Sequence, residues 1–324
     1  MNNFTILDIG ARGGLNWPWK KQKNVNQILI EADSDEALRL EKFYKSNKKI
    51  TVINSGLWNK KEKILIRITK SPGSSSFYEH NMSFLKRFPD SDRFNMVKSV
   101  EIEVQKLDDL STKKNLKADF IKIDIEGAEL NAFKGGKNFI SENIIGIESE
   151  VSFVNKNINQ PRFSEVDSYL TNVLGFELFD INQKYWKYEK GMKFGALKGR
   201  IIFADVLYLR PIDNLYDWLL KKELNEAINK FSSIVFSAYV YGLLDYAYEL
   251  ISEKKLEKFH DKKFIKSILR KIVRKRMINL QFKGSARLFY ALSYLINIIH
   301  PSHKKFGMGL KEDLGNNLKN TLWR

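Results

Sequence analysis

The sequence predicts an α/β fold, in which a mainly parallel sheet with an antiparallel edge strand is followed by an all-helical C-terminal region. Up to about residue 210, short apolar strand segments alternate with helical segments, which is the pattern of βαβ units. After Pro211 the apolar residues recur at a spacing near 3.6, and no strand segment competes with them. We therefore divide the 324 residues into a first domain, residues 1–210, and a helical domain, residues 211–324.

Eight segments of the first domain have the apolar, β-branched composition of strands. These strands are expected at residues 5–9, 27–31, 50–54, 63–69, 120–124, 144–148, 176–181 and 200–209. Helices are expected at residues 34–46, 128–141 and 163–174. The last two strands have no helical segment between them, so we expect a hairpin that gives the sheet its antiparallel edge.

Four helices are expected in the C-terminal domain, at residues 213–230, 232–252, 256–280 and 285–299. The second is apolar enough to suggest a membrane span, but Asp245 and Glu249 lie inside it, so we interpret it as a buried bundle helix. From Asp261 to Arg287 the chain contains ten Lys or Arg and one acid, with apolar residues at helical spacing. This basic amphipathic segment either exposes a lysine face to solvent or binds an anionic partner.

The composition narrows the class of protein. The chain has a formal net charge of +17, and 43% of its residues are hydrophobic. That hydrophobic content excludes a disordered chain, and the charge favours anionic ligands, although solvated lysines explain it equally well. The chain has no cysteine, which excludes disulfides and thiolate metal sites. The N-terminus runs straight into a strand without a signal core, so we expect a cytoplasmic protein.

A glycine-rich turn follows the first strand. The segment LDIGARGG places Asp8 at the strand tip, followed by Gly10, Gly13 and Gly14. Glycines permit a tight turn and a close approach of the backbone to a ligand. The spacing is neither that of the dinucleotide motif GxGxxG nor that of a phosphate-binding P-loop. An ordinary strand–helix connection therefore explains this turn as well as a binding site does.

An acid ends the second strand, in the segment ILIEAD. A carboxylate at this position, about 20 residues after a glycine turn, is where the hydroxyl pair of a ribose is recognised. Glu31 is the first candidate because it belongs to the strand, and Asp33 is the second. Asp33 has a competing role, since it or Ser34 could cap the next helix.

Three carboxylates gather where the strand at residues 120–124 ends, in the segment DFIKIDIEGAEL. Open α/β sheets bind ligands beyond the carboxyl ends of their strands, so Asp124 and Glu126 predict a site. Glu129 is expected in the first turn of the next helix, where a carboxylate suits the helix dipole. Glu148 and Glu150 end the next strand and could join Asp124 in a Mg²⁺ site, but we expect no metal.

Together these motifs resemble the FkbM family of class I S-adenosylmethionine-dependent methyltransferases. The resemblance rests on VQKLDDL at residues 104–110, DFIKIDIEGAELNAFKGG at 119–136 and IIGIESE at 144–150, and it covers about residues 4–210. It implies a Rossmann-like sheet and the cofactor S-adenosyl-L-methionine. It also implies methyl transfer to a hydroxyl of a sugar, a glycan precursor or another small molecule, in bacterial surface-polysaccharide or natural-product biosynthesis.

The resemblance also implies roles for single residues. Asp124 would orient the cofactor or the acceptor, and Glu126 or His80 would help to remove the acceptor proton. His80 competes with the plain interpretation of a loop histidine, and serines 74–76 could form either a substrate-covering loop or a flexible loop tip. Arg12 could pair with the cofactor carboxylate, with Glu31 or with Asp124, or face solvent. The implied cofactor site comprises Asp8, Gly10, Arg12, Gly13, Gly14, Glu31, Asn54, Ser55, Gly56 and Asp124.

Two other functions stay open. The positive charge suggests a nucleic-acid methyltransferase, but the fourth strand ends in DIEG and lacks the Asn/Asp-Pro-Pro-aromatic motif of enzymes that modify base amino groups. The second alternative is a catalytically inactive scaffold that binds an anionic surface through its basic tail. We expect a small-molecule or glycan acceptor, which the net charge suggests is anionic, and no nucleic acid. Peripheral contact with the inner face of a membrane through the basic helix is a further expectation.

Overall fold

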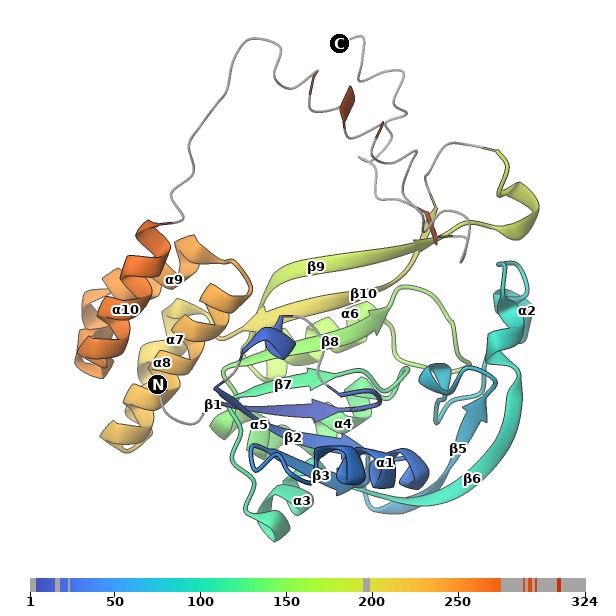
Figure 1. Ribbon diagram of the computed structural model, residues 1–324, viewed down its shortest axis with the longest axis horizontal. Coiled ribbons are helices and arrows are strands. Elements are labelled where there is room, and N and C mark those ends of the chain that lie inside the picture. Colours follow the sequence, from blue (N-terminus) through green and yellow to red (C-terminus); the bar gives the residue numbers. More distant parts are fainter. Residues whose placement is uncertain are drawn as a thin grey trace.

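The computed structural model describes residues 4–14, 18–22, 24–194 and 199–274, together with residues 288, 291–292, 295 and 308–309. Its centre is an eight-stranded sheet with the strand order β11-β9-β10-β8-β7-β1-β2-β3 (Figure 1). In chain order these strands are β1 Phe4–Ile9, β2 Val25–Glu31, β3 Ile50–Asn54, β7 Phe120–Ile123, β8 Gly146–Ser152, β9 Glu177–Trp186, β10 Arg200–Leu209 and β11 Met308–Gly309.

The pairing of these strands confirms the predicted sheet. Strands β3, β2, β1, β7 and β8 are parallel to their neighbours in the order given. Strand β10 is antiparallel to both β8 and β9, so the predicted hairpin forms the antiparallel edge. The carboxyl ends of β1, β2 and β7 therefore lie at one edge of the sheet, on the side that faces β5 and β6 in Figure 1.

A second, three-stranded sheet lies beyond this edge, with the order β4-β6-β5 (Figure 1). Its strands are β4 Gly56–Leu57, β5 Glu62–Thr69 and β6 Met96–Gln105. The predicted strand at residues 63–69 thus forms, but outside the main sheet. The sequence prediction missed β6 altogether, because most of its residues are exposed and it lacks the apolar run on which the strand assignment depends.

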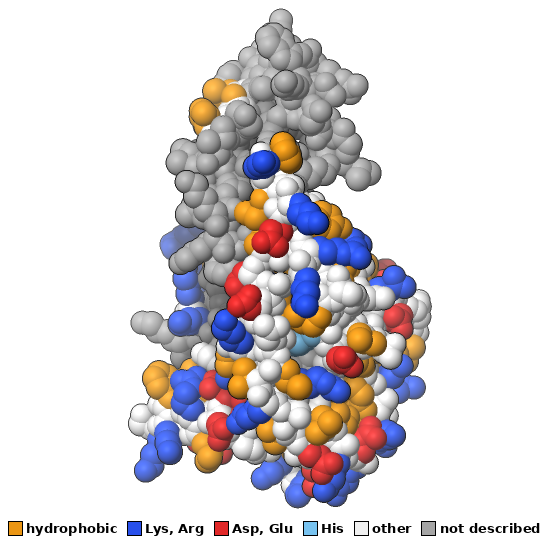
Figure 2. Space-filling view, turned by 90° about the vertical axis from the view of Figure 1, so that its right-hand side faces the viewer, with side chains coloured by type: hydrophobic (Ala, Val, Ile, Leu, Met, Phe, Trp, Pro, Cys, Tyr) orange, Lys and Arg blue, Asp and Glu red, His pale blue; other side chains and the backbone are white. Residues whose placement is uncertain are grey.

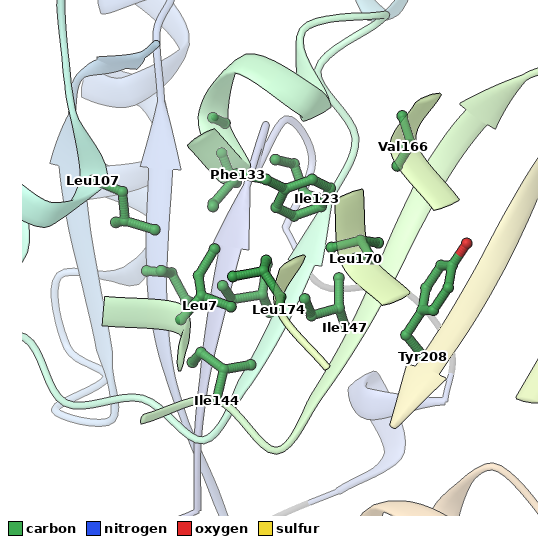
Figure 3. Packing of buried hydrophobic residues seen from close by; sticks show 14 of the residues in the cluster. Leu7, Leu107, Ile123, Phe133, Ile144, Ile147, Val166, Leu170, Leu174 and Tyr208 are labelled. Carbon is green, nitrogen blue, oxygen red and sulfur yellow. The ribbon is translucent and has the colours of Figure 1, made fainter. Parts of the chain in front are cut away.

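One face of the main sheet is covered by helices that come between or after the parallel strands. These are α3 Leu107–Lys114, α4 Glu129–Gly135, α5 Lys137–Asn143 and α6 Phe163–Ser168, which continues as a π-helical turn, Tyr169–Val173. Figure 3 shows how Leu7, Ile123 and Ile147 of the sheet pack against Phe133 and Leu170 of these elements. Alternate residues of a strand face opposite sides of a sheet, so this core uses only one side of β1.

The predicted helix at residues 128–141 is divided into α4 and α5. A Cβ on Gly135 would overlap the carbonyl oxygen of Trp58, and a Cβ on Gly136 would overlap the side chain of Leu107. The two glycines therefore let this part of the chain approach its neighbours closely, and the helix is interrupted where they lie.

The C-terminal helices pack on the opposite face, where Figure 1 shows them as one group beside the sheet. They are α7 Ile212–Leu220, α8 Leu224–Val240, α9 Leu244–Ser252 and α10 Lys262–Val273. Phe4 and Ile6 of β1, Phe120 of β7 and Phe231 of α8 belong to one buried cluster. The helix α1 Ser34–Tyr44 and the short helix α2 Met82–Leu85 complete the described α-helices of the ranges up to residue 274.

The C-terminal helices form with shifted boundaries. The break that we expected near residue 231 lies inside α8, and the chain turns instead after Val240, where Gly242 adopts a φ of +83°. The predicted helix at residues 285–299 lies largely outside the described residues, as does the basic segment beyond Arg274. Among the residues described, no helix has both the length and the apolar character required to cross a membrane.

Candidate active site

A pocket opens beyond the carboxyl ends of β1, β2 and β7, between the main sheet and the small sheet. Apolar side chains form much of its wall, and a few polar groups converge on it, as in small-molecule sites generally. The polar lining consists of Arg12, Glu31, Asp33, Ser55, Ser75, Ser76, Lys122, Asp124 and Glu126. Gly10 also lines the pocket, so five of the ten predicted cofactor residues and one further predicted catalytic residue come together here.

Gly10 brings the tips of two strands into contact. Its φ is +80°, and a Cβ at this position would overlap the carbonyl oxygen of Asp124. Its N–H donates to the carbonyl of Ile30 at 2.9 Å, which ties the turn to β2 as well. Gly13 and Gly14 share the same φ but are not among the pocket-lining residues. These two glycines shape the turn, whereas Gly10 lets the strand tips meet.

Arg12 pairs with carboxylates that sequence reasoning did not choose for it. Its guanidinium lies 2.6 Å from the carboxylate of Asp33 and 3.7 Å from that of Glu36. Asp33 also accepts a hydrogen bond from the N–H of Asp35 at 3.1 Å, which confirms that it caps α1. Because both of these contacts engage the Asp33 carboxylate, Glu31 is the better candidate for the residue that binds a ribose.

Glu31 is 6% exposed and belongs to the pocket wall. Burial raises its pKa, and a hydrogen bond from the N–H of Asp33 at 2.9 Å offsets part of that shift. A carboxylate has about four acceptor positions, so Glu31 keeps acceptor capacity for a ligand. The side chain of Asn54 donates to the Glu31 carbonyl at 2.9 Å and so joins β3 to β2. Ser55 lines the pocket next to it, while Gly56 is buried against Val104 at the start of β4.

Beneath the pocket, Lys122 lies between two carboxylates. Its ammonium is 3.7 Å from Asp8 and 3.6 Å from Asp124, because Asp8 and Lys122 are register partners on neighbouring strands. Asp8 is 1% exposed, and burial raises its pKa to about 7 although Lys122 opposes the shift. Burial alone would lower the pKa of Lys122, but the surrounding carboxylates outweigh it and raise that pKa.

Sequence reasoning missed Lys122. The signal was present in FIKID, because a lysine inside an otherwise apolar strand needs a partner when the strand is buried. Its position two residues before Asp124 places both side chains on the same face of the sheet. The structure makes Lys122 a wall residue of the pocket as well as a neighbour of two acids.

The loop after β7 is held in place by Glu129. Its buried carboxylate accepts hydrogen bonds from the N–H groups of Ile125 at 2.9 Å and Gly127 at 3.2 Å. Burial raises its pKa to about 7. Glu129 lies in the first turn of α4, as expected, and its bonds fix the chain at Glu126, whose φ is +53°.

Glu126 and Glu150 share a buried lysine. The ammonium of Lys156 lies 2.7 Å from Glu126 and 2.8 Å from Glu150. Burial raises the pKa of Glu150 well above its usual value, although Lys156 acts in the opposite direction. Oxygens of Asp124, Glu126 and Glu150 lie within 4.8 Å of one another, so Asp124 and Glu150 of the set considered for Mg²⁺ lie together, with Glu126 in place of Glu148. Lys156 already supplies a positive charge between two of them.

Glu148, the other acid considered for that arrangement, has a different partner. It accepts a short hydrogen bond from the hydroxyl of Tyr241, which follows α8. The indole N–H of Trp19 donates in turn to the same hydroxyl at 2.9 Å. Tyr241 therefore connects the end of α8 to an acid of β8.

His80 lies behind the loop of Glu126 and is not among the pocket-lining residues. It is 7% exposed, and its Nδ1 is 2.5 Å from the side-chain oxygen of Asn157. Asn157 donates to the carbonyl of Glu126 at 2.9 Å, and the hydroxyl of Ser76 donates to the same carbonyl at 2.7 Å. Burial lowers the pKa of His80. Its role as a base stays a prediction, and its link to the site runs through Asn157.

The fold and the pocket together define a class of protein. An open, mainly parallel sheet carries a glycine turn after its first strand, an acid at the tip of its second and a carboxylate at the end of its fourth. This is the arrangement that a class I S-adenosylmethionine-dependent methyltransferase implies. A family model described as the methyltransferase FkbM domain matches residues 8–178, and the chain belongs to this family.

Solved structures similar to the chain include a methyltransferase FkbM from Methylobacillus flagellatus KT, with 17% identity and a TM-score of 0.37 over 64% of this chain. The chain covers 43% of that structure's own length. A putative tRNA (m1A22) methyltransferase from Streptococcus pneumoniae has 13% identity and a TM-score of 0.33, over 84% of this chain and 92% of its own. A putative RNA methyltransferase from Pyrococcus horikoshii has 10% identity and a TM-score of 0.34, over 66% and 76%. No curated protein shows significant similarity to the chain.

Proposed function

We propose that this protein transfers a methyl group from S-adenosyl-L-methionine to a hydroxyl of a sugar, a glycan precursor or another small molecule, in surface-polysaccharide or natural-product biosynthesis. The observation that carries the proposal is the convergence of Gly10, Glu31 and Asp124 on one pocket. These residues lie at or just beyond the ends of three strands and line one pocket, which supports the roles that we propose for Glu31 as ribose acceptor and for Asp124 as reaction-site carboxylate.

The residues of the pocket fit this cofactor. Glu31 retains acceptor capacity that suits the two ribose hydroxyls. Apolar side chains, including Leu57 and Phe77, offer a surface for an adenine ring. Asp124 and Glu126 supply negative charge next to which a sulfonium is favoured. When bound, S-adenosyl-L-methionine supplies the electrophilic methyl group, and the protein must align the acceptor with it.

Asp124 is the best-placed carboxylate to orient the acceptor hydroxyl and take its proton. Its side chain is 39% exposed at the pocket, and its carboxylate lies 3.6 Å from the Lys122 ammonium. Glu126 is held by Lys156 at 2.7 Å, so its charge is already engaged. The Lys122 ammonium pairs with this carboxylate, and the Asp124 N–H donates to the Ile9 carbonyl at 3.0 Å, so less rotational freedom is lost when a ligand binds.

The lining also bears on the chemistry of the acceptor. Asp124 and Glu126 line the pocket, Glu150 lies next to them, and Lys156 engages Glu126 and Glu150. An anionic group placed there would meet unfavourable charge from Asp124. We therefore propose a neutral hydroxyl acceptor in place of the anionic one that the net charge of the chain suggests.

Calorimetric titration of S-adenosylhomocysteine, with NAD in parallel, tests the cofactor assignment. We expect S-adenosylhomocysteine to bind and NAD not to bind. Glu31→Ala should weaken binding by about 10- to 100-fold, because a hydrogen bond to a charged group contributes about 1.5–3 kcal/mol. The matched control is Glu41→Ala, which removes an exposed carboxylate from α1 and should leave binding unchanged.

Two outcomes would contradict the assignment. If the folded wild-type protein failed to bind S-adenosylhomocysteine, a non-catalytic scaffold would be favoured, and if it bound NAD, an NAD-dependent enzyme would be favoured instead. If both variants bound equally well, Glu31 would not be the ribose acceptor. Once binding is shown, a comparison of neutral and phosphorylated sugars as acceptors, followed by release of S-adenosylhomocysteine, tests the acceptor class.

A further inference from the structure

Helix α10 is strongly amphipathic, with most of its apolar side chains on one half and its charged side chains on the other. At about 100° per residue, the cations occupy one half of the helix and five of the six apolar residues the other half, while Val273 lies at the border, between Lys262 and Lys266. The cations are Lys262, Lys263, Lys266, Arg270, Lys271 and Arg274, and the apolar residues are Phe264, Ile265, Ile268, Leu269, Ile272 and Val273. The acid next to this stretch is the N-cap Asp261, whose carboxylate accepts hydrogen bonds from the first turn.

The apolar half of α10 already has a partner. Ile265 and Ile268 are buried in the cluster that joins the C-terminal helices to the sheet, and Leu269 and Ile272 pack against it. The helix contacts α8 and α9, beside which it lies in Figure 1. An amphipathic helix that inserts into a bilayer needs a free apolar half. The structure therefore points to contact through the charged half.

The charged half has one described contact of this kind, in which the Lys271 ammonium lies 5.7 Å from the centroid of the Tyr239 ring. All six cations are exposed, and none of them forms an ion pair with a described carboxylate. The exposed lysines of the small sheet differ, since Lys61 and Lys63 lie 2.9 Å and 3.0 Å from glutamates of β6. Figure 2 shows positive and negative side chains interspersed on the side of the molecule to the right in Figure 1. What sets the cations of α10 apart is that six of them lie along one helix, within residues 262–274, with Asp261 as the one acid beside them.

We propose that the charged half of α10 is an electrostatic docking surface for an anionic phospholipid membrane. Like-charged side chains along one helix favour a surface that presents many anionic groups, and lipid headgroups do so. A groove beside them is lined by Ile265, Leu269 and Val273, of which Val273 is 49% exposed. Apolar side chains beside cations suit the headgroup boundary. Single-stranded nucleic acid is favoured by aromatic stacking, and the charged half of α10 has no aromatic residue.

Docking through α10 leaves the candidate active site open. The C-terminal helices pack on Phe4 at the start of β1 and on Ile145 just before β8, whereas the pocket lies beyond the opposite ends of the parallel strands. Membrane contact and cofactor binding therefore use separate parts of the molecule, so a variant of one should leave the other unchanged.

Vesicle co-sedimentation of the full chain tests the proposal. We expect binding to phosphatidylcholine vesicles that contain about 30% phosphatidylglycerol at about 0.1 M salt, little binding to phosphatidylcholine alone, and release at about 0.5 M salt. The triple variant Lys266→Gln, Arg270→Gln, Arg274→Gln should weaken binding by about 100-fold, because each cation contributes about 1 kcal/mol, or about fivefold.

The matched control is Lys61→Gln, Lys63→Gln, Lys70→Gln, which removes the same amount of charge from exposed lysines that have carboxylate partners. It should bind vesicles like the wild type. Equal losses in both triple variants would overturn the proposal, because total charge would then govern binding. Failure of the wild-type protein to bind anionic vesicles would also overturn the proposal. Loss of oligonucleotide binding in the α10 variant, with vesicle binding intact, would assign this surface to nucleic acid instead. S-adenosylhomocysteine titration and circular dichroism verify that each variant is folded.

Discussion

At the scale of single residues, the charges under the pocket depend on burial. Asp8 and Glu129 are both buried, and burial raises the pKa of each to about 7. Glu129 accepts two backbone hydrogen bonds, whereas one oxygen of Asp8 has no hydrogen bond from the described residues and lies 3.7 Å from Lys122. Burial in the folded protein thus destabilises the ionised form of Asp8.

Asp8→Asn should therefore change how stability depends on pH. Between about pH 4 and pH 7 the unfolded chain releases the Asp8 proton while the folded protein keeps it, so this group lowers wild-type stability as the pH rises. Asparagine has no proton to lose. The free energy of unfolding of the variant, relative to wild type, should rise by up to about 4 kcal/mol across this range. Urea unfolding of both proteins at several pH values measures it, and a difference that stays constant with pH would refute the assignment.

At the scale of the elements, the pocket depends on how closely the tips of β1 and β7 approach each other. Gly10 and Gly13 form a natural comparison, because both have a φ of +80° but only Gly10 is crowded. A Cβ on Gly10 would overlap the Asp124 carbonyl oxygen, whereas no heavy atom outside its immediate neighbours lies within 4 Å of a Cβ built on Gly13.

We expect Gly10→Ala to lower stability by several kcal/mol and to abolish S-adenosylhomocysteine binding. Gly13→Ala should cost only the strain of a left-handed backbone, about 1–2 kcal/mol, and should keep binding. Thermal unfolding and calorimetric titration of both variants separate the two effects. If both variants lost the same stability and bound S-adenosylhomocysteine equally, the positive φ alone would explain the glycines of this turn, and the close approach of β1 and β7 would not.

At the scale of the whole molecule, the C-terminal helices complete the core of the sheet. Trp19 links the two parts, since its ring centroid lies 5.1 Å from both Phe4 and Phe120 of the sheet and 5.5 Å from that of Tyr241. In the described part of the β1–β2 connection, the regular element is the 3-10 turn Trp19–Lys21. The C-terminal helices therefore cover the sheet face that this connection leaves uncovered.

A fragment of residues 1–210 should consequently fail to fold on its own. It would expose Phe4, Ile6, Phe120 and Leu209, whose burial contributes about 1.5–3 kcal/mol each. The sum is comparable to the total stability of a typical domain, about 5–15 kcal/mol. Solubility and near-ultraviolet circular dichroism of the fragment measure this. A soluble, cooperatively folding fragment that binds S-adenosylhomocysteine would instead support two independent domains divided near residue 210.

The candidate site could be predicted to the extent that its residues lie at strand tips. Gly10, Glu31 and Asp124 each follow or end an apolar strand, and the tips of neighbouring parallel strands meet at one edge. Ile66 comes from the small sheet, which the prediction did not recognise because β6 lacks an apolar run. That Ile66 lines the pocket could therefore be recognised only from the structure.

The sequence by itself determined the strand–helix alternation, the antiparallel edge and the family, because these depend on local periodicity and on contiguous motifs. Only the tertiary structure decided the partners of the charges. Arg12 pairs with Asp33, Lys156 lies between Glu126 and Glu150, and the Tyr241 hydroxyl reaches Glu148. Ion pairs and hydrogen bonds form between side chains within about 3–4 Å, and the folded chain places residues far apart in sequence at that range.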